Sequence, residues 1–163
     1  RTVQSNVELL MELEGTENKR SKASVALKQV GLNGFEHSYP HQLSGGMKMR
    51  LSLARSLVLD PEYILLDEPL SAVDELTREV LQEELYEMWK RDKFTAILVT
   101  HNIAEAVYLS NRVIIMSPRP GKITDVVNIS KKLGFKKRTP ELRTTPQFSE
   151  VVNEIAGKLR TWK

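Results

Sequence analysis

The chain has 163 residues, which fits one domain of ordinary size, and its 40% apolar composition is enough for a packed core. It contains no cysteine, which excludes disulfides and thiolate metal sites, and no apolar run long enough to cross a bilayer. The net charge is +3, but residues 1–117 hold 13 basic and 17 acidic side chains, whereas residues 118–163 hold 11 and 4. We interpret this basic C-terminal part as a solvated surface; attraction to phosphates or to an anionic membrane is the alternative.

Apolar residues at helical spacing predict three helices in the first third of the chain. The first is expected over residues 3–14 and ends at Gly15. The second begins near Ala23 and stops at Gly31, and the third covers residues 45–58. The N-terminal part is therefore expected to be helical.

The hydrophobic pattern then changes to short, continuous apolar runs. Tyr63–Leu66 and Thr95–Thr100 are runs of this kind, and we expect strands that are covered on both faces. A helical stripe from Leu76 to Met88 separates them. A strand, a helix and a strand of this size predict a βαβ unit with parallel strands and a right-handed crossover.

The rest of the chain mixes helices and strands. A capping pattern that begins at Asn102 predicts a short helix. Arg112–Met116 and Ile123–Ile129 are expected to be strands around a turn rich in proline. We interpret Lys131–Arg138 as a mobile basic loop, and a last helix is expected to start with Pro146 at its first position.

The start of the third helix has the features of an anion site. Ser44, Gly45 and Gly46 precede an amphipathic run, so that backbone N–H groups and the positive end of a helix would face a ligand. The simpler interpretation is that Ser44 caps the helix and that the glycines permit a tight approach. Taken alone, these residues favour the simpler interpretation.

Two carboxylates follow the first strand, at an edge of the sheet where open α/β proteins bind ligands. Asp67 could hold Mg²⁺ there, and Glu68 could orient or deprotonate an attacking water; the alternative is that both are solvated charges at a strand end. His101 follows the second strand and could bind a phosphate oxygen, or it could be satisfied by nearby backbone. We interpret His37 and His41 as loop residues rather than metal ligands.

These signals occur together and in a particular order, and the chain resembles the ATP-binding subunit of ABC (ATP-binding cassette) transporters. Leu43–Gly46 resembles the signature motif, Ile64–Glu68 resembles Walker B, and Ser71–Asp74 resembles the D-loop. His101 stands where the family has its switch histidine. The resemblance implies an α/β fold, namely the C-terminal part of an ABC-type P-loop NTPase domain, with a helical subdomain and a mostly parallel sheet flanked by helices.

The resemblance also implies a role for each of these residues. Asp67 would hold Mg²⁺, Glu68 would be the general base, and His101 would contact the γ-phosphate of ATP. Ser44, Gly45, Gly46 and Met47 would close on ATP held by a second ATP-binding subunit, and Asp74 would lie at that dimer contact. Met47 departs from the family pattern, because this position is often glutamine and methionine offers no amide.

One family motif is missing from the sequence. No G-x-x-x-x-G-K-[S/T] loop occurs in the 163 residues, so we expect an N-terminally truncated domain that is inactive and poorly soluble by itself. Within that partial domain, residues 1–58 would form the helical subdomain and signature helix. Residues 59–130 would run from Walker B to the last strands, and residues 131–163 would form the basic loop and terminal helix.

Three further stretches resemble importers of nitrate, sulfonate, taurine or related small anions; they are Tyr39–Met47, Ser117–Gly121 and Glu141–Arg143 before the terminal helix. The implied function is ATP hydrolysis that powers an ABC importer at the cytoplasmic face of the membrane. The implied partners are a second ATP-binding subunit, transmembrane permease subunits and, indirectly, a solute-binding protein. The alternative is a non-transport ABC ATPase that acts on nucleic acid or the ribosome, although no nucleic-acid partner is expected from this chain.

Overall fold

The computed structural model describes residues 1–71, 73–134 and 137–160. The chain divides into two compact units. The first, called the N-terminal unit, consists of Arg1–Arg78 and Phe94–Ile97; the second, called the C-terminal unit, consists of Glu79–Lys93 and Leu98–Lys163. Among the described residues, no helix combines the length and the apolarity that a membrane crossing requires.

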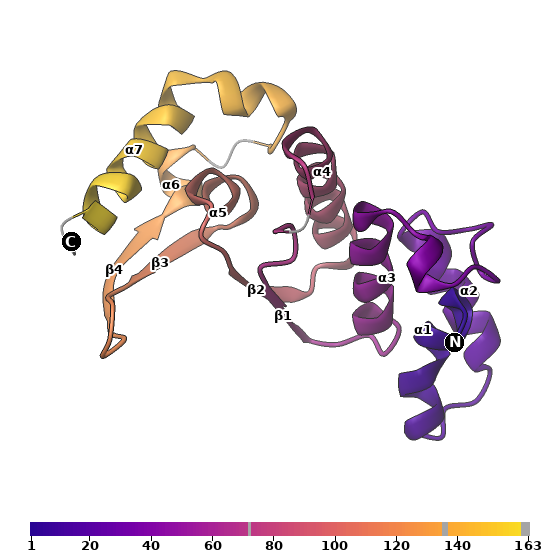
Figure 1. Ribbon diagram of the computed structural model, residues 1–163. Coiled ribbons are helices and arrows are strands. Elements are labelled where there is room, and N and C mark those ends of the chain that lie inside the picture. Colours follow the sequence, from indigo (N-terminus) through magenta and orange to yellow (C-terminus); the bar gives the residue numbers. More distant parts are fainter. Residues whose placement is uncertain (72, 135–136, 161–163) are drawn as a thin grey trace. The chain divides into compact units, whose positions relative to one another are not determined.

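Three helices pack on one another in the N-terminal unit (Figure 1). They are α1 (Val3–Leu13), α2 (Lys19–Gln29) and α3 (Gly45–Leu57). The bounds of α1 and α3 are close to those predicted, whereas α2 begins at Lys19, before the predicted start near Ala23. Their shared core consists of side chains that are at most 8% exposed. These are Val3, Val7, Met11, Ala23, Ala26, Leu27, Leu32, Met49, Leu51, Leu53 and Ala54.

Gly31 ends α2, as its position in the sequence predicts. Its φ is +69°, a left-handed conformation that glycine adopts without steric cost. The amide of Leu32 donates to the carbonyl of Leu27 at 2.8 Å, so the chain reverses and Leu32 becomes fully buried. The loop beyond it contains a short 3₁₀ helix, Pro40–Gln42, that the sequence did not indicate.

The two central strands, β1 (Tyr63–Asp67) and β2 (Thr95–Val99), pair in a two-stranded sheet. The long helix α4 (Glu75–Asp92) lies between them in the sequence, as expected. The residues that the structure describes do not cover these strands on both faces. Ile64 is 3% exposed, but Leu65 is 75% exposed and Val99 55% exposed. A continuous apolar run identifies a strand without specifying which elements lie on its two faces.

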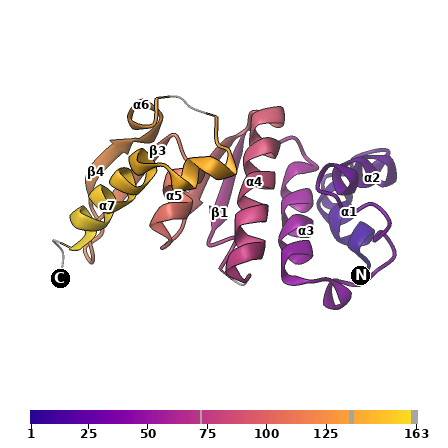
Figure 2. The ribbon, with the colours of Figure 1, turned by 90° about the horizontal axis from the view of Figure 1, so that it is seen from above.

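The C-terminal unit is built on a β-hairpin of β3 (Arg112–Met116) and β4 (Ile123–Asn128). The strands are antiparallel, with Arg112 opposite Asn128 and a bulge between Ile115 and Met116. Helices α5 (Ile103–Leu109), α6 (Ile129–Lys132) and α7 (Pro146–Arg160) pack in this unit, where α7 lies against α5 and α6 (Figure 2).

The hairpin is apolar on both faces. Ile115 and Val127 are buried in a cluster with residues of α5, α6 and α7. Four apolar side chains of the same two strands are instead more than half exposed. They are Ile114 (55%), Met116 (59%), Ile123 (64%) and Val126 (51%).

The predicted mobile loop Lys131–Arg138 is only partly a loop. Lys131 and Lys132 belong to α6, because the Asn128 side chain accepts a hydrogen bond from the Lys131 amide at 2.8 Å and caps the helix. Phe135 and Lys136 lie outside the described residues. Arg138 is 7% exposed and donates to the carbonyl of Ser110 at 3.2 Å, so its side chain is not part of a solvated surface.

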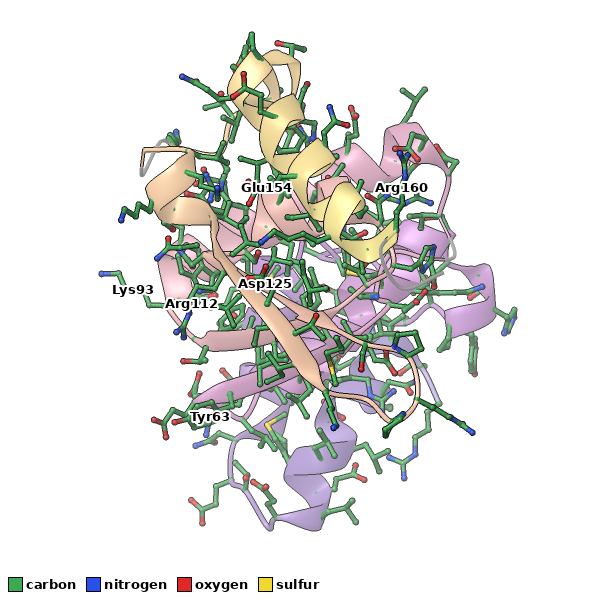
Figure 3. All side chains as sticks on the ribbon, turned by 90° about the vertical axis from the view of Figure 1, so that its left-hand side faces the viewer. Tyr63, Lys93, Arg112, Asp125, Glu154 and Arg160 are labelled. Atoms are coloured by element: carbon green, nitrogen blue, oxygen red, sulfur yellow. The ribbon has the colours of Figure 1, made fainter. Side chains whose placement is uncertain are left out.

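The last helix, α7, starts at Pro146 as predicted and buries Phe148, Val151 and Ile155. It follows a 3₁₀ helix, η2 (Pro140–Thr144), that the sequence pattern did not reveal. Its outer side carries ion pairs: Glu154 pairs with Lys132 at 2.7 Å, and Lys158 pairs with Asp125 of β4. Figure 3 labels Asp125 and Glu154 on these neighbouring elements.

Candidate functional site

The first candidate element is the start of α3. Ser44 is the N-cap residue, and its hydroxyl accepts a hydrogen bond from the backbone amide of Met47 at 3.2 Å. The interpretation of Ser44 as a helix cap is therefore confirmed. Ser44 and Gly45 are exposed, Met47 is half-buried, and Gly46 is buried. The first turn has no acidic side chain, so its positive end is accessible to an anion.

The second candidate element is the end of β1. Asp67 is the last residue of the strand and is exposed, and Glu68 follows it and is half-buried. Glu68 has a φ of +45°, in the left-handed region. This conformation costs a residue with a side chain about 1–2 kcal/mol, and such strain concentrates at functional sites. Asn18, Asp60 and Lys93 share this conformation, so it marks a turn at Glu68 and is compatible with the predicted role.

The turn after Glu68 is closed by hydrogen bonds to main-chain carbonyls. The carbonyl of Glu68 accepts from the amide of Ser71 at 3.2 Å and from its hydroxyl at 2.9 Å. Arg78, from the first turns of α4, donates to the carbonyl of Val73 at 3.0 Å and to that of Leu70 at 3.4 Å. These contacts fix the carbonyl groups of Glu68, Leu70 and Val73.

The side chain of Arg78 is only 20% exposed and forms an ion pair with Glu75, although charged residues along a helix usually face solvent. The sequence offers no local signal for the carbonyl contacts, because they form with residues that precede the helix. Arg78 is a site-supporting residue that the sequence analysis missed.

Asp74 caps α4. Its side chain accepts a hydrogen bond from the amide of Thr77 at 3.0 Å. Hydrogen bonds from Thr77, first from its side chain and then from its backbone, hold the pKa of the Asp74 carboxyl below its usual value. The carboxylate is exposed and stays charged at neutral pH, which suits both a cap and a contact with another chain.

His101 lies in the other unit. It is exposed and occupies the turn between β2 and α5, directly before Asn102, which caps α5 by accepting from the amide of Glu105 at 3.0 Å. Asn102 in turn donates its own amide to the hydroxyl of Thr100 at 3.0 Å. The predicted site residues thus fall into two sets: Ser44–Met47, Asp67, Glu68 and Asp74 in the N-terminal unit, and His101 in the C-terminal unit.

The donors near β1 fit Mg²⁺ better than a metal held entirely by protein. Mg²⁺ usually keeps several waters and takes one or two protein carboxylates together with substrate phosphates. Asp67 is an exposed carboxylate at a strand end and meets that requirement. In the part of the chain that the structure describes, no group of three or more His, Asp or Glu side chains gathers as a metal cage.

Comparison with known sequences agrees with the order of the motifs. The family model described as "ABC transporter" matches residues 1–71. An uncharacterized ABC transporter ATP-binding protein of Methanocaldococcus jannaschii is 44% identical over 162 residues, which cover 98% of this chain and 58% of the relative. The aliphatic sulfonates import ATP-binding protein of Bacillus cereus is 43% identical over 154 residues, covering 94% of this chain and 59% of the relative. The chain therefore spans less than two thirds of the length of these relatives.

A solved structure supports the same fold. It is the dimeric structure of an ATP-binding cassette in a post-hydrolysis state, bound to ADP and Pi. It superimposes with a TM-score of 0.63 at 31% identity, covering 78% of this chain and 56% of that one. The expected fold class, part of an α/β ABC-type NTPase domain, is confirmed. The chain belongs to the ABC transporter family and matches part of its ATP-binding subunit.

Proposed function

We propose that the full-length protein is the ATP-binding and ATP-hydrolysing subunit of an ABC importer. The observation that carries this proposal is the carboxylate pair at the end of β1. Asp67 is exposed there, and Glu68 is held in a left-handed conformation by a turn closed through Ser71. A carboxylate at a strand end is suited to act on a water molecule that attacks a phosphoryl group.

Each site residue has a role in this proposal. Glu68 is the general base, Asp67 holds Mg²⁺, and His101 contacts the γ-phosphate. When bound, Mg²⁺ supplies positive charge that stabilises the phosphates during transfer. The exposed start of α3, at Ser44 and Gly45, supports a contact with ATP.

The ATP that the start of α3 contacts belongs to a second ATP-binding subunit in this proposal. Gly46 and Met47 complete that contact, and Asp74 lies at the dimer interface. The dimeric state of the superimposed ATP-binding cassette supports such an arrangement. The further partners are permease subunits, which place the protein at the cytoplasmic face of the membrane, and a solute-binding protein that acts through them.

The proposed cargo is a small anion such as a sulfonate, taurine or nitrate. The similarity to the sulfonate import protein of Bacillus cereus supports this class. The stretches Tyr39–Met47 and Ser117–Gly121, which resemble the importer group, agree with it. Uptake of a labelled sulfonate, taurine or nitrate by cells that make the whole transporter identifies the cargo.

The proposal is tested by purifying the full-length protein from its native membrane and measuring phosphate release from MgATP. We expect co-purification with a permease and turnover that Glu68→Gln abolishes. Stable recovery with nucleic acid or ribosomes and without a permease would overturn the importer assignment. Unchanged turnover in Glu68→Gln would remove Glu68 as the base.

A further inference from the structure

The side chain of Arg143, in η2, connects two helices of the C-terminal unit. Its Nη1 donates to Glu83 Oε1 at 2.9 Å, and its Nη2 donates to Gln82 Oε1 at 3.0 Å, both on α4. Its guanidinium carbon lies 3.6 Å from the centroid of the Tyr108 ring, on α5. One planar cation therefore joins α4, α5 and the C-terminal segment.

This contact is shielded from solvent. The Arg143 side chain is 15% exposed, Gln82 is 5% exposed and Tyr108 is 1% exposed. A guanidinium group can stack on an aromatic ring and donate hydrogen bonds to two oxygens at the same time, which a lysine ammonium cannot do. Both interactions strengthen when water is excluded. Loss of Arg143 would leave the buried Gln82 oxygen without this donor.

Helix α5 has seven residues, and its apolar side chains pack on β3 and α7. The Arg143 contact adds a directional polar contact that joins α5 to α4. Tyr108 lies about 9 Å along the helix axis from the cap residue Asn102. A contact that fixes Tyr108 therefore fixes the angle of α5 and, with it, the place of the residue before the cap, His101.

We propose that Arg143 is a positioning residue for His101, which it orients by fixing α5 against α4. This inference rests on the proposed function, because it takes His101 as the contact to the γ-phosphate. Arg143 itself touches neither nucleotide nor water in this account. Its effect reaches the reaction through Tyr108, α5 and the Asn102 cap.

The test is a double-mutant cycle in the full-length protein, with kcat and KM for ATP measured for Arg143→Met, His101→Ala and the double variant. Small displacements remote from the chemistry cost up to about 100-fold in rate. We expect Arg143→Met to lower kcat by about 10- to 100-fold with little change in KM. In the His101→Ala background, the same substitution should have no further effect on kcat.

Two outcomes would overturn the inference: an unchanged kcat in Arg143→Met, or an equal loss with and without His101. A wild-type rate in His101→Ala would overturn it as well. If Glu68→Gln still abolishes turnover in that case, the inference fails while the proposed function stands. If Glu68→Gln retains turnover, Glu68 is not the base; if the wild type itself releases no phosphate from MgATP, the proposed function fails.

Milder variants keep the test decisive if Arg143→Met does not fold. Arg143→Lys keeps the charge but loses the fork, and Glu83→Gln weakens one contact; both should lower kcat in the same direction by smaller factors. The matched control is Lys132→Met, which also removes a cation from this unit by breaking the pair with Glu154. We expect its kcat to equal that of the wild type, and a loss equal to that of Arg143→Met would overturn the inference.

Discussion

Ser71 holds the main-chain carbonyl of Glu68 with both its amide and its hydroxyl. The turn that these bonds close keeps Glu68 at a φ of +45°. The backbone conformation of Glu68 thus sets the direction of its side chain. Substitutions of Glu68 can distinguish its effect on ATP hydrolysis from the effect of its left-handed backbone on stability.

Glu68→Gln and Glu68→Gly should both abolish ATP hydrolysis by the full-length protein while ATP binding persists. Loss of a general base costs about 10²–10⁴-fold in rate. The glycine variant should be the more stable of the two by about 1 kcal/mol, because glycine relieves the left-handed strain. Phosphate release, nucleotide binding and urea unfolding check the three expectations. A glycine variant that is less stable than the glutamine variant would contradict the strain argument.

Ser44 can be tested for two roles at once. Ser44→Ala removes the hydrogen bond to the Met47 amide and should destabilise the protein by about 1 kcal/mol, whereas Ser44→Gly should cost only a few tenths. If the hydroxyl also contacts ATP, both variants should lose turnover to a similar extent. Urea unfolding and ATPase assays of the pair separate the roles. If turnover falls in Ser44→Ala but not in the more stable Ser44→Gly, the result would show that Ser44 acts only as a helix cap.

Arg78→Met should loosen the segment between Glu68 and α4, because its guanidinium binds the carbonyls of Leu70 and Val73. A hydrogen bond from a charged group contributes about 1.5 kcal/mol or more, so amide exchange in this segment should speed up about tenfold. Hydrogen exchange with mass spectrometry measures this. Arg91→Met is the control, since Arg91 forms a local ion pair with the adjacent Asp92. Equal rates of amide exchange in Arg78→Met and Arg91→Met would contradict the role assigned to Arg78.

The ion pair between Asp125 and Lys158 should make stability depend on pH. The hydrogen bond from Lys158, followed by one from the Val126 amide, holds the pKa of the Asp125 carboxyl below its usual value. A lowered folded-state pKa stabilises the protein above the unfolded value of about 3.9, and this stabilisation is lost as pH falls through the lower folded value. Asp125→Asn should therefore be less stable than wild type at neutral pH, and the difference should shrink in acid.

Urea unfolding of the full-length protein at several pH values tests this expectation. Glu150→Gln, at an exposed position of α7, provides the control with the same change of charge. A constant difference between wild type and Asp125→Asn across the acid range would contradict the assigned role of the pair.

Local signals in the sequence predicted the elements that depend on a few adjacent residues. Ser44 before two glycines predicted the start of α3, and Pro146 predicted the first residue of α7. Contacts across long separations could not be predicted. Arg143 and Glu83 are 60 positions apart, and nothing near Arg143 indicates that it crosses to α4 and α5. The exposed Leu65 was missed because an apolar run does not reveal what covers it.

The order of the motifs predicts Asp67, Glu68, Asp74 and His101 as site residues, and their roles stay a prediction. The local geometry of these residues was not predictable from the sequence. The left-handed backbone of Glu68 was not predictable, because glutamate rarely adopts it and a neighbouring proline does not require it. The role of Arg78 was not predicted because its partners are backbone carbonyl groups, which every residue has and which a side-chain pattern does not distinguish.

The hairpin of β3 and β4 has a consequence for the synthesis of the chain. Ile114 and Val126 lie on its uncovered face, so this apolar surface remains open after α5, α6 and α7 have packed on the other side. Exposed β-rich surfaces of this kind attract holdase chaperones and self-associate. The 163-residue chain made alone in cells should therefore be recovered with chaperones or in inclusion bodies. The substitution Ile114→Lys would place a charge on this apolar surface, oppose aggregation and raise the yield of soluble, monodisperse protein.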